Sequence, residues 1–199
     1  MNTMSNPLHA RQSAVALLIS ALALVLLPLA HHPLTPLRLL SLGICSFGIW
    51  AFCDEMGLHK PLNRAGMVAF AMAAVSRLIS LVDTQTAALA RFHLLYAFGL
   101  MIAMLLWSAA YLHRQRELKW VGAVGALASL LPIVLLLAGH LALGAGVYFG
   151  FGALMAAAEG GAMQDNSALQ LIDAVFAVWL LITSGLLWTG QIRDLPPSH

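Results

Sequence analysis

Six long apolar runs, separated by short polar breaks, constrain the fold of this chain more than any other feature. Each run is close to the roughly 20 residues that a helix needs to cross the hydrocarbon layer of a bilayer. Lipid offers no hydrogen-bond partner to a free backbone N–H or C=O, so each run must be helical. The runs also lack the period-2 alternation of barrel strands. The sequence therefore predicts an all-α, polytopic transmembrane helix bundle with six spans. The spans cover about residues 13–30, 37–53, 65–82, 92–112, 120–140 and 169–190.

The composition agrees with a chain that is surrounded by lipid. Only 9% of the 199 residues are charged, 61% are apolar, and the mean hydropathy is +0.87. A soluble domain carries roughly 25% charged residues, so its water-exposed surface could not be built from this sequence. We expect a single transmembrane domain over residues 1–199, with no soluble catalytic domain. No basic run with interleaved aromatic residues occurs, which argues against a nucleic-acid partner.

The distribution of basic residues predicts the orientation of the spans. The first run is longer than the apolar part of a signal peptide, so we expect it to be retained as a helix. With six spans and a cytoplasmic N-terminus, seven Lys or Arg residues fall on the inner side and two on the outer side. This bias predicts that both termini are cytoplasmic in a cell membrane, the bacterial inner membrane. The inner residues are Arg11, Lys60, Arg64, Arg114, Arg116, Lys119 and Arg193, and the outer ones are Arg38 and Arg91.

One glycine-rich apolar stretch, residues 141–158, leaves two topologies open. It could form a seventh span. However, only one or two residues separate it from the fifth run, too few for a reversal across the membrane, and a seventh span would place Arg193 outside. We therefore expect a helical continuation that forms an outer re-entrant or interfacial segment over residues 141–166. Gly146 and Gly150 form a GxxxG pattern, which allows close helix contact.

Arg77 is a basic residue inside the third apolar run. It follows Arg64 by 13 residues, which places it roughly 20 Å from the inner boundary at a rise of about 1.5 Å per residue. A charge that faces lipid there costs about 2.5 kcal/mol or more. Asp173 enters the last span from the same side, so we expect Arg77 and Asp173 to form an intramembrane ion pair or an anion site. The alternative is an arginine that extends to the outer headgroups. A stripe of small residues beside Arg77 favours the bundle interior: Ala69, Ala73, Ser76 and Ser80.

Further polar residues gather on the expected outer side. Asp83, Arg91, His93 and His140 are predicted to form a polar cluster there, and His31 and His32 follow the first span. Two of these imidazoles could ligate haem b. Three of them, with an acidic residue such as Asp83 or Glu159, could bind copper or zinc. The metal candidates are His31, His93 and His140, but no HxxxH spacing supports them. We therefore expect interfacial histidines and no cofactor, with haem b or copper as the alternative.

No catalytic arrangement can be recognised in the sequence. No serine or cysteine nucleophile is grouped with a histidine and an acid, and no Walker loop or GxGxxG occurs. Cys45 and Cys53 are expected to be packing residues. We expect a non-enzymatic accessory protein, scaffold or small transport protein, with the bilayer and either another membrane protein or a second copy as partners. The alternatives are a redox or metal-handling protein that uses the outer histidines, and an enzyme in which Arg77 holds a lipid phosphate.

Two stretches of sequence carry resemblances to known families. The segment AVSRLISLVD at 74–83, within 39–112, and YFGFG at 148–152 resemble parts of small uncharacterised four-helix bacterial membrane proteins, in a different order along the chain. GHLA at 139–142 followed by LIDAVFAVWLL at 171–181 is similar to a pattern of copper-resistance inner-membrane proteins. The second resemblance implies metal binding. Phe176 stands near the position at which that family would offer a histidine.

Overall fold

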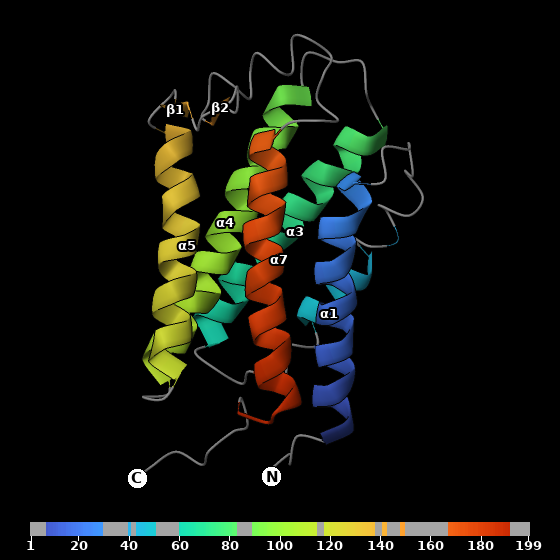
Figure 1. The fold of residues 1–199 in the computed structure, drawn as a ribbon, viewed down its shortest axis with the longest axis vertical. Helices are drawn as coiled ribbons and strands as arrows, with labels where there is room; N and C mark the ends of the chain where they lie inside the picture. Colours follow the sequence, from blue (N-terminus) through green and yellow to red (C-terminus); the bar gives the residue numbers. More distant parts are fainter. Residues whose placement is uncertain are drawn as a thin grey trace.

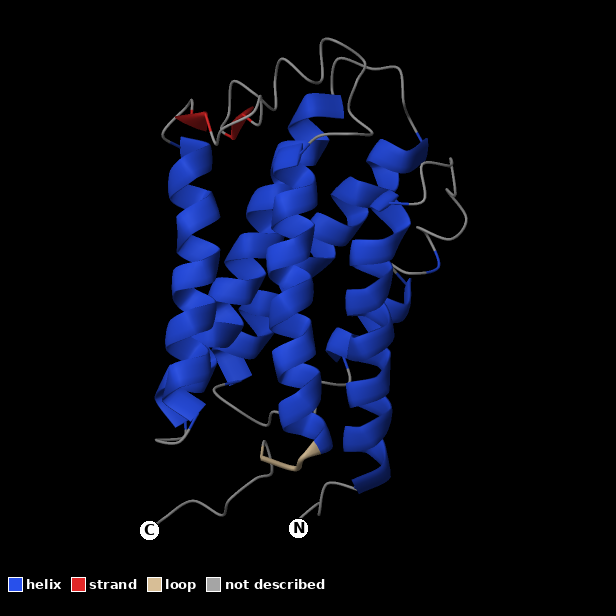
Figure 2. Cartoon of the chain, viewed as in Figure 1, coloured by secondary structure: helices blue, strands red, loops and turns tan. Residues whose placement is uncertain are grey.

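The computed structural model is a bundle of helices with one very short strand pair. It describes residues 7–29, 40, 43–50, 60–82, 89–114, 118–137, 141–142, 148–149 and 167–191. The long helices are α1 (Pro7–Leu29), α3 (Lys60–Val82), α4 (Leu89–Arg114), α5 (Lys119–Leu137) and α7 (Ser167–Trp188). A shorter helical segment covers residues 43–50. Figure 2 shows how completely helix dominates the described chain.

The helices run up and down alongside one another, with α4 in a central position (Figure 1). α4 packs mainly against α3 and α5 and also contacts α7, while α1 packs against α7. The 43–50 segment is held against α1, because Gly48 brings its backbone close to Ala16. The consecutive helices α3 and α4 and the sequence-distant α7 thus share the interior in which the polar residues lie.

Each of the six predicted runs contains a helix, so the prediction of an all-helical bundle is confirmed for most of the described chain. The second run is represented only by residue 40 and by residues 43–50. Within the described residues, three stretches are long and apolar enough to cross a membrane, judged by length and composition. They are Pro61–Ser80, Phe92–Leu112 and Leu171–Trp188. Ala10–Leu24 and Lys119–Val134 are shorter apolar stretches.

The outward faces of these helices carry large apolar side chains. Leu127 on α5 is 69% exposed, and Val68 on α3 and Val178 on α7 are more than half exposed. A helix at the surface of a water-soluble bundle would instead present a polar face to solvent. The bundle therefore has an apolar exterior as well as an apolar core.

Small residues let the helices approach closely. A Cβ atom on Gly99 of α4 would lie 3.0 Å from the Ala69 carbonyl oxygen and from the Ala73 side chain of α3. In the predicted stripe of small residues, Ala73, Ser76 and Ser80 are buried and Ala69 is partly buried. Serine hydroxyls donate hydrogen bonds to backbone carbonyl oxygens of their own helix; Ser76, for example, donates to the Met72 carbonyl oxygen at 2.8 Å. Between helices, Ser184 of α7 donates to the Ala14 carbonyl oxygen of α1 at 2.7 Å.

The glycine-rich stretch after α5 differs from the expected helix. Leu141–Ala142 (β1) and Tyr148–Phe149 (β2) form a two-residue antiparallel pair, with Leu141 opposite Phe149. The expected helical continuation is therefore wrong at these four residues. Glycine disfavours helix, and Tyr and Phe favour extended backbone, which explains the difference. The pair lies at the end of the bundle where α5 ends and α7 begins (Figure 1). The rest of 141–166, including Gly146 and Gly150, lies outside the described residues.

The helix directions bring most of the predicted inner basic residues to one end of the bundle. α1, α3 and α5 begin there, and α4 and α7 end there (Figure 1). The exposed Arg11, Arg64 and Lys119 side chains belong to this end. Arg11 also lies over the Trp188 ring, with 5.7 Å between its guanidinium carbon and the ring centroid, so it links the start of α1 to the end of α7. We call this the basic end, and the other the opposite end.

Candidate functional site

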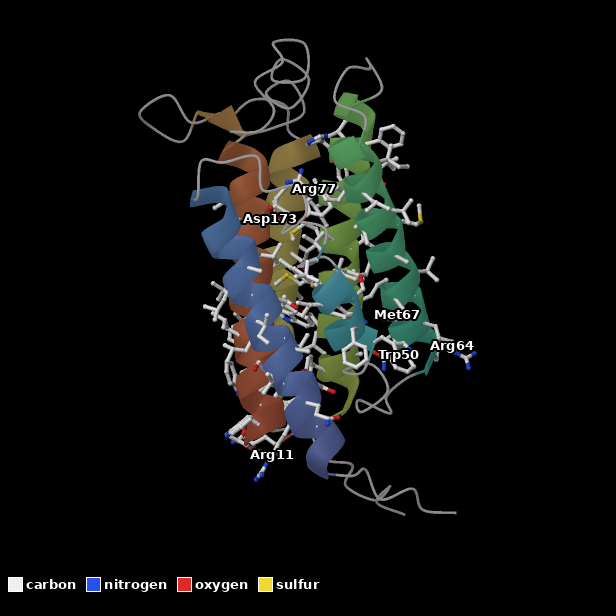
Figure 3. The ribbon with its side chains drawn as sticks, turned by 90° about the vertical axis from the view of Figure 1, so that its right-hand side faces the viewer. Arg11, Trp50, Arg64, Met67, Arg77 and Asp173 are labelled. Carbon is white, nitrogen blue, oxygen red and sulfur yellow. The ribbon has the colours of Figure 1, made fainter. Side chains whose placement is uncertain are left out.

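Four polar side chains from three helices meet inside the apolar bundle. Arg77 comes from α3, His93 and Tyr96 from α4, and Asp173 from α7. His93 and Tyr96 are each 4% exposed and Asp173 is 5% exposed, whereas Arg77 is half-buried. Figure 3 shows Arg77 and Asp173 near one another at the same level, far from Arg11 and Arg64 at the basic end. We call these four residues the polar network.

Tyr96 is the residue that joins the network, because it uses two different parts of its side chain. Its hydroxyl donates a hydrogen bond to Asp173 Oδ1. Its ring lies under the Arg77 guanidinium, whose carbon is 5.1 Å from the ring centroid. A cation at this distance is attracted to the negative face of the ring. Tyr96 therefore contacts both charged residues at once and ties α4 to α3 and to α7.

His93 fixes the direction of Arg77. The Arg77 Nη1 and His93 Nε2 atoms are 3.4 Å apart. Because a guanidinium can only donate, Nε2 accepts and the imidazole proton lies on Nδ1. His93 is buried on α4, so this contact turns the guanidinium into the bundle.

Arg77 and Asp173 were predicted to form an ion pair or an anion site. Both side chains contact Tyr96, so the structure brings them to the same place. Among the described residues, however, the contacts of Arg77 are with His93 and with the Tyr96 ring, and no direct ion pair with Asp173 is formed. A tyrosine therefore stands between the two charges. The expected ion pair or anion site at these two residues stays a prediction.

The polar network lies a short distance inside the opposite end of the bundle. Arg77 is five residues before the end of α3 at Val82, and Asp173 is six residues after the start of α7 at Ser167. At a rise of about 1.5 Å per residue, these distances are roughly 7 and 9 Å along the helix axes. The network is therefore much nearer to one end of the bundle than to the basic end.

Four stacked aromatic rings fill the interior on the other side of the network, toward the basic end. Trp107 of α4 and Trp179 of α7 are stacked, with centroids 5.7 Å apart and an angle of 13° between the rings. Phe176 of α7 stacks on Trp179 at 6.0 Å and on Phe70 of α3 at 6.2 Å. We call these residues the aromatic layer. All four are buried, so the layer closes the interior between the network and the basic end.

Other positions highlighted by the sequence have mixed outcomes. Cys45 is buried beside Ser20, which agrees with a packing role. Among the aromatic residues, Tyr111 is buried at 1% exposure, whereas Trp50 is 59% exposed. Trp107 and Trp179 are buried.

Most of the predicted outer cluster cannot be compared with the structure. His31, His32, Asp83, His140 and Glu159 lie outside the described residues, as does the side chain of Arg91. Of the predicted cluster and the metal candidates, only His93 has a described side chain, and it contacts Arg77. Within the described residues, no three His, Cys, Asp or Glu side chains group in a way that could hold a metal ion. Haem b and copper therefore remain predictions.

Sequence reasoning missed Tyr96, the residue on which the network depends. A usable signal was present, because Tyr96 follows His93 by three positions and therefore shares its helix face. Tyrosine is readily interpreted as an interfacial residue, and here it lies in the interior instead. Comparison of the chain with protein-family models, curated proteins and solved structures gives no match.

Proposed function

We propose that this chain is an integral membrane protein of the bacterial inner membrane, with six spans and both termini in the cytoplasm. Its apolar exterior, the length of its helices and the short breaks between them support this proposal. The gathering of Arg11, Arg64 and Lys119 at one end supports the orientation, because basic residues are enriched on the cytoplasmic side. The basic end would then face the cytoplasm and the polar network the outer leaflet.

Within this class, the function that fits the geometry best is that of a small transport protein. The observation that carries this proposal is the polar network itself. An ionisable side chain at the centre of a spanning helix costs about 2.5–3.5 kcal/mol on insertion scales, and such residues mark substrate or ion pathways. Asp173 and Arg77 are brought together from two helices and share a partner on a third. The aromatic layer lies between these residues and the basic end, as expected for a pathway that is closed toward the basic end.

An accessory or scaffold role is the second function, favoured by the same tie between helices. In that case the network would only hold α3, α4 and α7 in place. The two functions differ in their expected behaviour after purification. A transport protein moves charge or solute when reconstituted alone, whereas an accessory protein needs a partner that co-purifies with it or a second copy of the chain.

Reconstitution into liposomes tests the transport proposal. Transient currents on a solid-supported membrane would be recorded after steps in proton, sodium, chloride and phosphate concentration. Wild type is expected to give currents for at least one gradient, and Asp173→Asn is expected to reduce them strongly. Gly185→Ala is the matched control, because nothing lies within 4 Å of a Cβ atom at that position of α7. Folded wild-type protein that gives no current above empty liposomes would overturn the transport proposal.

Reporter fusions test the topology independently. Green fluorescent protein fused after residue 199 is expected to fluoresce, because it folds in the cytoplasm. Alkaline phosphatase at the same point is expected to be inactive, and both results reverse if the C-terminus lies outside.

A further inference from the structure

We propose that Arg77 is the centre of a binding site for a phosphate-type oxyanion, near the outer end of the bundle. The inference deepens the transport proposal and rests on the membrane location given there. It starts from the donors of Arg77. A guanidinium carries five N–H donors in a planar fork, and in the described residues one of its amino nitrogens contacts His93 while its face covers Tyr96. The other donors have no described acceptor.

The guanidinium is held in a fixed position for this task. The His93 contact sets its direction, and the Tyr96 ring supports one face. A fixed planar fork matches the geometry of a phosphate or carboxylate and loses little freedom on binding. Stacking leaves the edge of the guanidinium available, and an oxyanion binds at that edge. His93 and Tyr96 are therefore positioning residues, and Arg77 is the residue that contacts the anion.

Asp173 limits the affinity without blocking the site. Its carboxylate is engaged by the Tyr96 hydroxyl on the far side of the cation–ring contact, and no direct ion pair with Arg77 is formed among the described residues. Arg77 is thus not neutralised by direct contact, but an anion beside it still experiences a nearby negative charge. Moderate binding of this kind suits a pathway, since an ion must leave as readily as it enters.

The location of the network sets the direction of access. Arg77 is half-buried and lies roughly 7 Å along the helix axis from the end of α3, so the opposite end is the shorter route to it. Toward the basic end, Phe70, Phe176 and Trp179 are stacked and buried. A phosphate group can come from two sources at this depth, either a free ion from the outer solution or the headgroup of a lipid in the outer leaflet.

Binding is measured on protein in a non-ionic detergent without added lipid. In the first arm, inorganic phosphate is titrated at constant ionic strength with chloride as the balancing ion, and thermal unfolding and tryptophan fluorescence are followed. In the second arm, phosphatidylglycerol molecules that stay bound are counted by native mass spectrometry. Wild type is expected to bind in one arm, which identifies the source as free ion or headgroup.

The Arg77 variants decide the assignment. Loss of a charge-assisted pair in Arg77→Gln is expected to weaken binding roughly tenfold to a hundredfold. Arg77→Lys keeps the charge but loses the planar fork, so it is expected to bind with intermediate affinity, and it guards against a variant that fails to fold. Arg64→Gln, at an exposed arginine near the basic end, is the control and is expected to bind as wild type does.

Two results would overturn the anion site: no binding by wild type in either arm, or equal binding by wild type and folded Arg77 variants. Neither depends on transport. Binding without reconstituted currents would overturn the transport proposal alone. Currents without phosphate or phosphatidylglycerol binding would overturn the anion site alone.

Discussion

Removing the Tyr96 hydroxyl is the most direct perturbation of the polar network. Tyr96→Phe deletes the donor to Asp173 Oδ1 but retains the ring that lies under Arg77. The hydrogen bond to Asp173 is lost, and the contact between the ring and the Arg77 guanidinium is kept. The variant therefore separates the tie between α4 and α7 from the contact between α3 and α4.

The expected loss of stability follows from the type of acceptor. Hydrogen bonds to a charged group contribute about 1.5–3 kcal/mol. Between transmembrane helices, measured side-chain hydrogen bonds average only about 0.6 kcal/mol. With an ionised Asp173, we expect Tyr96→Phe to lower the free energy of unfolding by about 1.5–3 kcal/mol. A measured loss near 0.6 kcal/mol would instead indicate a hydrogen bond between two neutral groups, with Asp173 protonated.

A double-mutant cycle in mixed detergent micelles measures this bond, provided that unfolding is reversible. The coupling between Tyr96→Phe and Asp173→Asn is expected to equal most of the loss in Tyr96→Phe, because either change alone weakens the same bond. The coupling between Tyr96→Phe and Arg77→Gln is expected to be near zero, because phenylalanine preserves the ring face. A large coupling in the second cycle, or none in the first, would refute the geometry proposed for Tyr96.

Three further predictions follow from the same packing. Arg77→Ala and Asp173→Ala should each destabilise the protein in detergent by up to about 3–5 kcal/mol, because each change leaves the other charge uncompensated beside Tyr96, and the double variant by less than the sum; additive losses would show that the two charges are independent. Gly122→Ala would place a Cβ atom 2.7 Å from the Ser108 carbonyl oxygen and should lower the free energy of unfolding by about 1–3 kcal/mol. The control Gly185→Ala, where nothing lies within 4 Å of a Cβ atom, should not lower it; equal melting temperatures of the two variants would contradict this packing. Protein purified from cells supplied with haem precursor and copper should show no Soret band and no stoichiometric metal by elemental analysis, and either signal would support the outer histidines as ligands.

The sequence was sufficient to predict the helices because lipid permits so few backbone conformations. Each apolar run had to be helical, and the observed bounds of α4 and α7 lie within a few residues of the predicted ones. The rule failed in the glycine-rich apolar stretch after α5, where Leu141–Ala142 was predicted as helix and forms a strand instead. Glycine disfavours helix, so hydropathy alone does not decide the backbone conformation of a stretch that is rich in it.

The candidate site was only partly accessible to sequence reasoning, because helix neighbours cannot be inferred from hydropathy. Arg77 and Asp173 were recognisable as charges in apolar runs, since a charge is unfavourable wherever it faces lipid. Tyr96 carries no charge and fits an apolar helix, so nothing required it to have a polar partner. Its role emerges only when α4 is placed between α3 and α7.

Tyr96 contacts Arg77 through its ring and Asp173 through its hydroxyl, so one contact can change without the other. This matters for a site that must bind an anion and release it. An anion that binds the edge of Arg77 can leave the guanidinium over the ring face, because the contact with the ring uses the face and not the edge. The hydroxyl bond to Asp173 uses a separate part of the tyrosine side chain. Binding at Arg77 therefore need not loosen α4 from α7. A direct Arg77–Asp173 pair would lack this property, because any ligand of the arginine would have to break the same contact that holds the helices together.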